Sequence, residues 1–83
     1  MPVTLTAAFR TPRAEWQAIA LATLDGHYLA PHCYMRIHGW RDWSKVAQPF
    51  AATPQTATDL ARHLHHVAQH IEGQTVTTPN TTP

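Results

Sequence analysis

The chain has one cysteine, Cys33, a single lysine, three isolated glycines and few charged residues. One cysteine excludes an internal disulfide and a zinc cluster built from several thiolates. Three separate glycines provide no glycine-rich phosphate loop. No apolar run is long enough to span a membrane, and the first residues lack the apolar core of a signal peptide. These absences predict a cytoplasmic protein with no cofactor and no membrane partner.

Size and charge narrow the class of protein further. The 83 residues are enough for one domain, at a size where oligomerisation is a common source of stability. The net charge is only +1, so a long polyanion is not an obvious partner of the whole molecule. Residues 73–83 are rich in Thr and Pro, with Val76 as their one large apolar residue. This composition predicts a single domain over residues 1–72 and a disordered tail over 73–83.

The clearest element is an amphipathic helix over residues 54–72. Thr53 suits the N-cap, Pro54 the first helical position, and Gly73 the residue just past the end. Its apolar stripe consists of Ala57, Leu60, Ala61, Leu64, Ala68 and Ile71, with Val67 at the edge. On Thr53, Pro54, Ala57, Leu60 and Ala61 the segment is similar to a recurring ending of small proteins from high-GC bacteria and their phages. That resemblance carries no functional residue across.

The segment over residues 12–25 allows two interpretations. Thr11 and Pro12 could cap a helix that ends at Gly26, although Arg13 and Gln17 would interrupt its apolar face. A hairpin that turns at Asp25 and Gly26 fits better, because glycine accepts a positive φ. Its register pairs Leu24 with His27, Ala18 with Cys33, Trp16 with Met35, and Glu15 with Arg36. The last pair places opposite charges across the two strands, which favours the hairpin.

The hairpin has one apolar face that is expected to lie against the helix. It consists of Trp16, Ala18, Ala20, Ala22, Leu24, Leu29, Cys33, Met35 and Ile37. Flanking strands are predicted over residues 3–9 and 46–52, the second confined to an edge by Pro49. The sequence therefore predicts an α+β fold. Its antiparallel β-sheet has about four strands in β-β-β-β-α order, with one C-terminal helix packed on one face.

A single helix cannot cover both faces of such a sheet, and the uncovered face is rich in aromatic, aliphatic and basic residues. The candidate partner-binding residues are Ile19, Leu21, Tyr28, Tyr34, Arg36, His38, Trp40, Arg41, Trp43 and Lys45. A patch of this kind usually marks a partner site, and Arg, Trp and Tyr are the usual anchors. We therefore expect a small non-catalytic interaction or regulatory module that acts through this face. It would work as a homodimer with the second faces packed together, or docked on another protein.

Two other interpretations of the same face stay open. Tyr34, Trp40 and Trp43 could stack the bases of a single-stranded nucleic acid. His38, Arg36, Arg41 and Lys45 would then meet phosphates, with Asp42 and the near-neutral net charge against it. Alternatively, the two tryptophans simply fold over the sheet edge and complete a thin core.

The seven histidines raise a metal hypothesis. His63, His66 and His70 share a helix face with Asp59, opposite the apolar stripe, and the last two have the i, i+4 spacing of a shared ion. The simpler expectation is a solvated helix face. The five acidic residues are scattered along the sequence, and Cys33 is expected to face the helix as a small buried side chain. No catalytic residue is therefore predicted, and the protein is not expected to be an enzyme.

Overall fold

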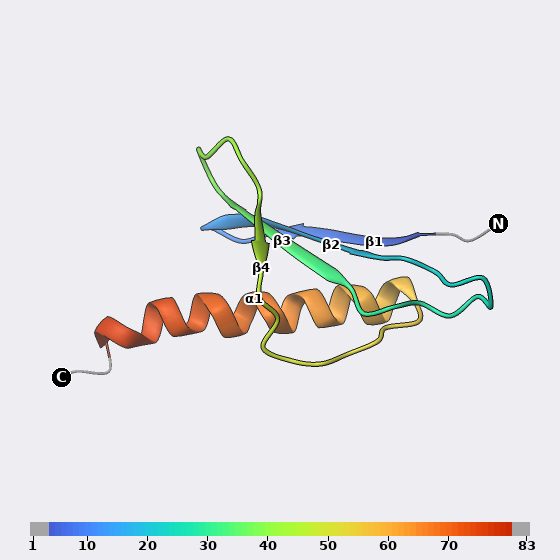
Figure 1. The fold of residues 1–83 in the computed structure, drawn as a ribbon. Helices are drawn as coiled ribbons and strands as arrows, with labels where there is room; N and C mark the ends of the chain where they lie inside the picture. Colours follow the sequence, from blue (N-terminus) through green and yellow to red (C-terminus); the bar gives the residue numbers. More distant parts are fainter. Residues whose placement is uncertain (1–3, 81–83) are drawn as a thin grey trace.

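A computed structural model describes residues 4–80, and the side chains of residues 4–73. The chain forms an antiparallel sheet of four strands in the order β1-β2-β3-β4, followed by one helix (Figure 1). The elements are β1 (Leu5–Arg10), β2 (Ala14–Ala20), β3 (His32–Ile37), β4 (Ser44–Val46) and α1 (Ala57–Asn80). The predicted α+β fold, with its β-β-β-β-α order, is thus confirmed, and residues 12–25 contain strand β2 rather than a helix.

The predicted register of the central strand pair is confirmed. Trp16 lies opposite Met35, Ala18 opposite Cys33, and Glu15 opposite Arg36. Side chains alternate between the two faces of a strand, and a slip of one residue would reverse every one of them. The buried positions of β2 are accordingly Ala14, Trp16, Ala18 and Ala20, with Cys33 beside them on β3.

The turn between β2 and β3 differs from the prediction. Thr23 rather than Leu24 faces His27, because the amide of Thr23 donates to the carbonyl of His27 at 2.7 Å. A three-residue loop ends at Gly26, whose φ of +86° is the left-handed conformation this turn requires. One extra residue between Tyr28 and His32 then restores the predicted register further along the strands.

Because of this bulge, the faces near the turn are exchanged. Tyr28 lies opposite Ala22 and packs against the core, although it was predicted on the other face. Leu24, with 97% of its surface exposed, and Leu29, with 52%, were predicted to face the helix, and they do not. The polar side chain of Gln55 fixes the new arrangement, since it accepts from the amide of Tyr28 and donates to its carbonyl, both at 2.9 Å.

The helix begins three residues later than predicted. Thr56 is the N-cap, because its hydroxyl accepts from the amide of Asp59 at 3.1 Å. The buried stripe consists of Leu60, His63, Leu64, Val67 and Ala68, so Ala57 and Ala61 lie outside its centre. The helix passes Gly73 instead of ending before it. The disordered tail predicted for 73–83 falls mostly on residues whose side chains are outside the described part, and it stays a prediction.

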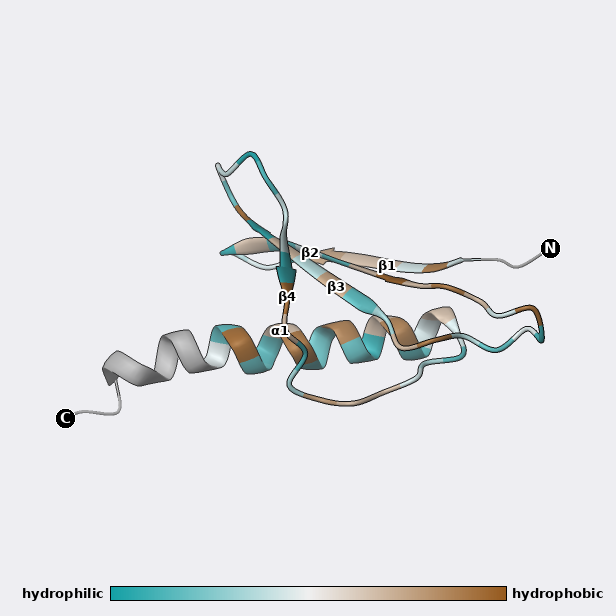
Figure 2. Cartoon of the chain, in the orientation of Figure 1, coloured by the Kyte–Doolittle hydropathy of each residue, from teal (hydrophilic) through white to brown (hydrophobic). Residues whose placement is uncertain are grey.

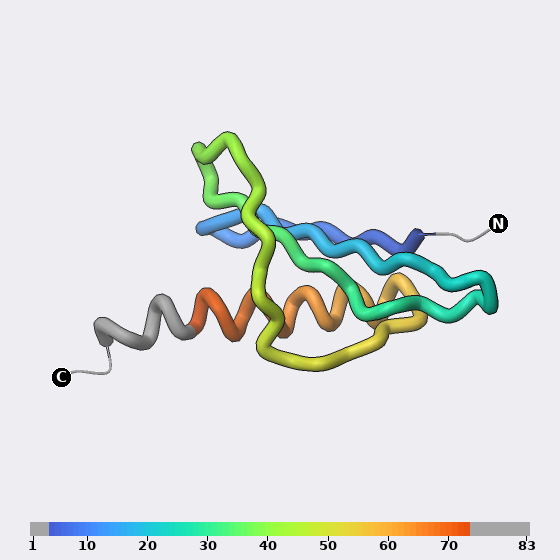
Figure 3. The backbone as a smooth tube through the Cα atoms, in the orientation of Figure 1, coloured from blue at the N-terminus to red at the C-terminus, as the bar shows by residue number. Residues whose placement is uncertain are grey.

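The core lies between α1 and the first two strands. The helix packs on β1 and β2, as the apolar segments facing one another in Figure 2 illustrate. Alanines at three of the four buried positions of β2 let the helix approach closely, while Trp16 supplies the bulk. The connection between β4 and α1 runs along the helix before it reaches the start of α1 (Figure 3).

The last strand is much shorter than predicted. β4 covers three residues, Ser44–Val46, and the predicted strand over 46–52 is wrong. Pro49 has no amide hydrogen for a sheet ladder, and the chain bends there toward the helix. The first strand fits its prediction well, since Leu5, Ala7 and Phe9 all pack against the core.

Candidate functional site

The face of the sheet turned away from α1, here called the open face, is built from alternate residues of the strands. The cross-strand register places its side chains in three rows. These rows are Arg10–Glu15–Arg36, Ala8–Gln17–Tyr34–Lys45 and Thr6–Ile19–His32. Three charged side chains thus share one end of the face. The middle row is low at Ala8 and Gln17 and rises at Tyr34, and the last row brings in the apolar side chain of Ile19.

The side chains of the charged row are paired with one another. Glu15 accepts from Arg36 at 2.7 Å and from Arg10 at 3.3 Å. The guanidinium of Arg36, more than that of Arg10, holds the pKa of the Glu15 carboxyl below its usual range. Arg36 also lies under the ring of Trp43, with its Cζ 4.8 Å from the ring centroid. Arg36, predicted as a partner-binding residue, is therefore occupied in holding Trp43 over the sheet.

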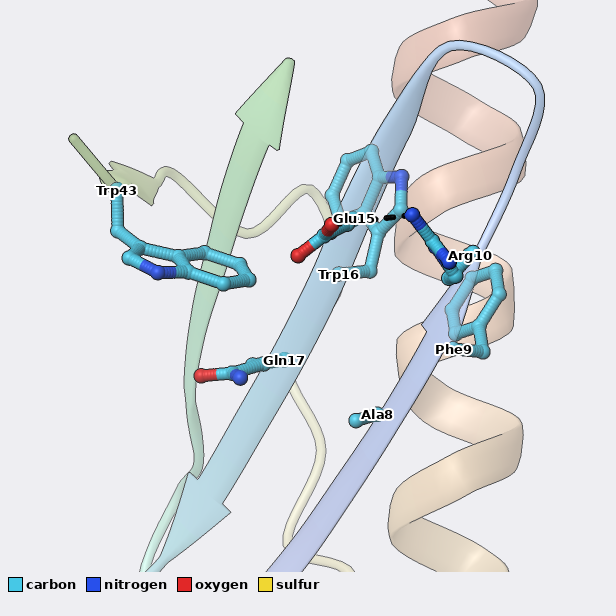
Figure 4. A pocket seen from close by; sticks show the side chains of 7 residues that line it. All are labelled: Ala8, Phe9, Arg10, Glu15, Trp16, Gln17 and Trp43. Atoms are coloured by element: carbon cyan, nitrogen blue, oxygen red, sulfur yellow. Dashed lines mark hydrogen bonds and ion pairs between the residues drawn. The ribbon is translucent and has the colours of Figure 1, made fainter. Parts of the chain in front are cut away.

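Next to this row the open face is hollowed. Two hollows of about 360 Å³ and 520 Å³ share Ala8 and Gln17 as their common floor, and we call them together the trough. Trp43 lines the first, and Tyr34 and Ile19 line the second. Figure 4 shows the indole of Trp43 standing over β3 on one side of Gln17, with Arg10 and Glu15 joined above the floor. The trough has aromatic groups on its β3 side, while its β1 side is the edge of the sheet.

Beyond the trough the open face continues as an apolar strip toward the hairpin turn. Leu21 and Leu29 lie across from one another, because the amide of Leu29 donates to the carbonyl of Leu21 at 2.8 Å. About half of each side chain is exposed, and Ile19 is half-buried beside them. Of the predicted residues, Ile19 and Leu21 do belong to this surface, whereas Tyr28 does not. Because of the bulge, Leu29 lies on the open face where Tyr28 was predicted. No local sequence pattern predicts this bulge.

The loop between β3 and β4 stands off the sheet on the side away from α1 (Figures 1 and 3). It turns at Gly39, with a φ of +90°, where the amide of Trp40 donates to the carbonyl of Ile37 at 2.9 Å. His38 hydrogen-bonds the carbonyl of Thr11 through Nε2 at 2.8 Å, which ties the base of the loop to the turn between β1 and β2. Trp40 is 62% exposed, and Arg41 beside it is exposed as well.

The helix histidines do not form the predicted three-ligand site. His63 is only 8% exposed and lies on the core side of α1, where its Nε2 pairs with Oε1 of Gln48 at 2.6 Å. Burial, more than the neighbouring His66, lowers the pKa of His63. Among the described residues, no group of three His, Cys, Asp or Glu side chains is placed to hold a metal ion. Binding of an ion by His66 and His70 alone stays a prediction.

The other two histidines of the predicted site, His66 and His70, lie exposed on the helix surface. Phe50, from the connection before α1, contacts His66 and His70 edge-on, with ring centroids 6.3 Å and 5.3 Å apart. Gln48 also donates to the carbonyl of Pro31, so it joins the bulge of β3 to the helix through His63. On the other flank His65 stacks on Phe9 with the ring centroids 3.9 Å apart.

Glu72 has a structural role that the sequence did not reveal. Its Oε2 accepts from the indole Nε1 of Trp16 and from the hydroxyl of Thr11, both at 2.7 Å. The partners are separated by 56 and 61 residues, so no local spacing could have found them. The same hydroxyl of Thr11 accepts from the amides of Arg13 and Ala14, which shapes the turn between β1 and β2.

Cys33 is fully buried in the core, as predicted. Burial raises the pKa of its thiol to about 11, so the group stays protonated at neutral pH. Within the described residues, no helix is both long enough and apolar enough to cross a membrane.

Comparisons with known protein families, with curated proteins and with solved structures find no match for this chain.

Proposed function

We propose that the chain is a small non-catalytic interaction module that binds a segment of another protein in the trough of the open face. The observation that carries the proposal is the trough itself, a low floor of Ala8 and Gln17 beside a fixed indole. Arg36 holds Trp43 in place before any partner arrives, which reduces the entropy lost on binding. Aromatic anchors beside a preformed hollow are typical of protein interfaces.

The surface next to the trough supports a protein partner. Half-buried Ile19 and the exposed side chains of Leu21 and Leu29 extend the hollow as an apolar strip, and a contiguous strip of this kind usually marks an interaction site. Arg36 and Glu15 neutralise one another at the other end, which removes one of the cations predicted to meet phosphates. The loop that carries Trp40 rises from the same face and would obstruct close stacking of two flat open faces.

The test fills the trough and measures peptide binding. Peptides selected from a displayed random library against the whole chain serve as probes, and their affinity is measured by titration calorimetry. Gln17→Trp adds a bulky side chain to the floor at an exposed strand position, and we expect it to weaken binding roughly tenfold or more. Thr58→Trp adds the same side chain to an exposed position of α1 and should leave the affinity unchanged. Peptides that bind both variants equally would refute a binding site in the trough.

Single-stranded nucleic acid is the second candidate for the same trough. It is favoured by the exposed cations Arg10, Arg41 and Lys45 around the aromatic side chains. Three phosphate contacts would give a log–log salt slope of about −2. Fluorescence anisotropy with a labelled oligo-dT at several salt concentrations measures this slope. Salt-dependent binding that Gln17→Trp abolishes would favour this candidate over a protein partner.

A further inference from the structure

The two edges of the sheet are built differently. β4 has three residues, carries Lys45 and is followed by Pro49, and each of these features discourages pairing with another strand. β1 has six residues in unbroken register with β2, no proline, and a charge only at Arg10. No described strand pairs with its outer edge. One edge of the sheet is thus protected, while the other presents a long row of unpaired backbone groups.

We propose that β1 pairs antiparallel with β1 of a second copy, around a two-fold axis at Ala7, so that the two sheets become one. Directly opposed residues of an antiparallel pair point to the same face, so the alignment must join helix-facing residues to each other. Placing Ala7 opposite itself achieves this, because Leu5 then faces Phe9 of the second copy, both from the apolar side. On the open face, Thr6 faces Ala8 of the second copy.

The helices fit this arrangement. Each α1 lies over β1 and β2, and strands are about 4.8 Å apart, so the two helix axes would be about 10 Å apart across the two-fold axis. Packed helices are commonly about 8–10 Å apart. The flank of α1 on this side carries His65 and Gln69, and these two residues line a hollow of about 260 Å³ together with Phe9 and Arg10 of β1. Stable interfaces bury roughly 800 Å² per partner, and the paired flanks would add their area to that of the strands.

Pairing of the β1 strands would also complete the trough. In one copy the trough has Tyr34 and Trp43 on its β3 side and the bare edge of β1 on the other. In the dimer the two troughs would meet across the axis, giving one floor with aromatic groups on both sides. Five strand spacings then separate the two β3 strands, a width of about 24 Å. What this joined trough holds rests on the proposed function, whereas the pairing of β1 does not.

The experiment measures solution mass by size-exclusion chromatography with light scattering, over roughly 1–500 µM. We expect the wild type to show twice the monomer mass of 9.3 kDa at the upper concentrations. The double variant Thr6→Lys with Ala8→Lys opposes like charges across the axis, at positions exposed in the monomer, and should return the mass to 9.3 kDa. The variant Thr6→Lys with Ala8→Glu opposes unlike charges and should remain a dimer.

A matched control adds two lysines to the same face away from the edge. Gln17→Lys with His32→Lys uses exposed positions of β2 and β3, and it should remain a dimer. Far-UV circular dichroism verifies that each variant is folded. A wild type that is monomeric throughout overturns the proposal, and so does a control that dissociates, which would place the interface on the open face. Loss of the dimer in the variant with unlike charges overturns the alignment at Ala7. Peptide binding by a monomer would leave the proposed function standing while this proposal fails.

Discussion

The bonds of Glu72 lead to the sharpest prediction about stability. Replacing Glu72 by alanine leaves the indole N–H of buried Trp16 without its partner at 2.7 Å. A hydrogen bond to a charged group contributes about 1.5–3 kcal/mol, and a buried donor left unpaired costs a similar amount. The hydroxyl of Thr11 loses the same acceptor but keeps the carbonyl of Ala14 within 3.4 Å. We therefore expect Glu72→Ala to lower the free energy of unfolding by about 2–3 kcal/mol.

For a domain of this size, that loss corresponds to a fall in Tm of roughly 10–20 °C in a thermal melt followed by circular dichroism. Thr58→Ala, at an exposed position in the first turn of α1 and outside the hollow beside β1, is the control and should change Tm little. Combining Glu72→Ala with Trp16→Phe isolates the bond in a double-mutant cycle, because phenylalanine has no N–H to leave unpaired. A coupling free energy below about 0.5 kcal/mol would refute the role assigned to this hydrogen bond.

Three further predictions concern titrating side chains. The Glu15 pKa is lowered in the fold by Arg36, so the stability it contributes is complete above the ordinary value of 4.5 and is lost as pH falls below it. Melts from pH 7 to pH 3 should therefore show a smaller loss for Glu15→Gln than for the wild type, and identical slopes would contradict the ion pair. The His63 pKa is lowered by burial, so stability should begin to fall as pH drops through its ordinary value of 6.5. His63→Gln should reduce the change of the denaturant midpoint between pH 7 and pH 5. If the midpoint of this variant depends on pH as in the wild type, burial of His63 is not the cause of the stability loss. With a thiol pKa of about 11, about one Cys33 in a thousand is a thiolate at pH 8, and burial also shields it from solvent. Native protein should react with a disulfide reagent only as fast as it unfolds, and immediate labelling would show that the thiol is accessible.

Most of the sheet could be predicted because several local signals agreed. The alternation of apolar residues in β2 and β3, and the pairing of Glu15 with Arg36, both require the register that the structure has. The pairing at the turn was predicted one residue away from its position in the structure. The extra residue of the bulge before His32 restores the predicted pairing along the rest of the hairpin. A bulge leaves no periodic signal in one sequence, so the exchange of Tyr28 and Leu29 between faces could not be predicted.

The errors near the helix have a different physical origin. The sequence offers two candidate helix starts, one at Thr53 with Pro54 and one at Thr56 with Asp59. The structure uses the second, because the Asp59 amide donates a hydrogen bond to the Thr56 hydroxyl. The burial of His63 depends on Gln48, fifteen residues away in a connection with no regular structure. The trough was anticipated only as a face rich in aromatic residues, because its floor consists of alanine and glutamine, which carry no signal of binding in a sequence.

The order of the elements along the chain has a consequence for how the protein is made. Each strand pairs with its neighbour in sequence, so the sheet can form from local hairpins as the chain emerges during synthesis. The helix that covers β1 and β2 comes last, which makes its docking the step with the longest loop to close. Until then the apolar side of the sheet, with Trp16 at its centre, faces water. We therefore expect aggregation during synthesis to occur mainly in the interval between sheet formation and docking of the helix.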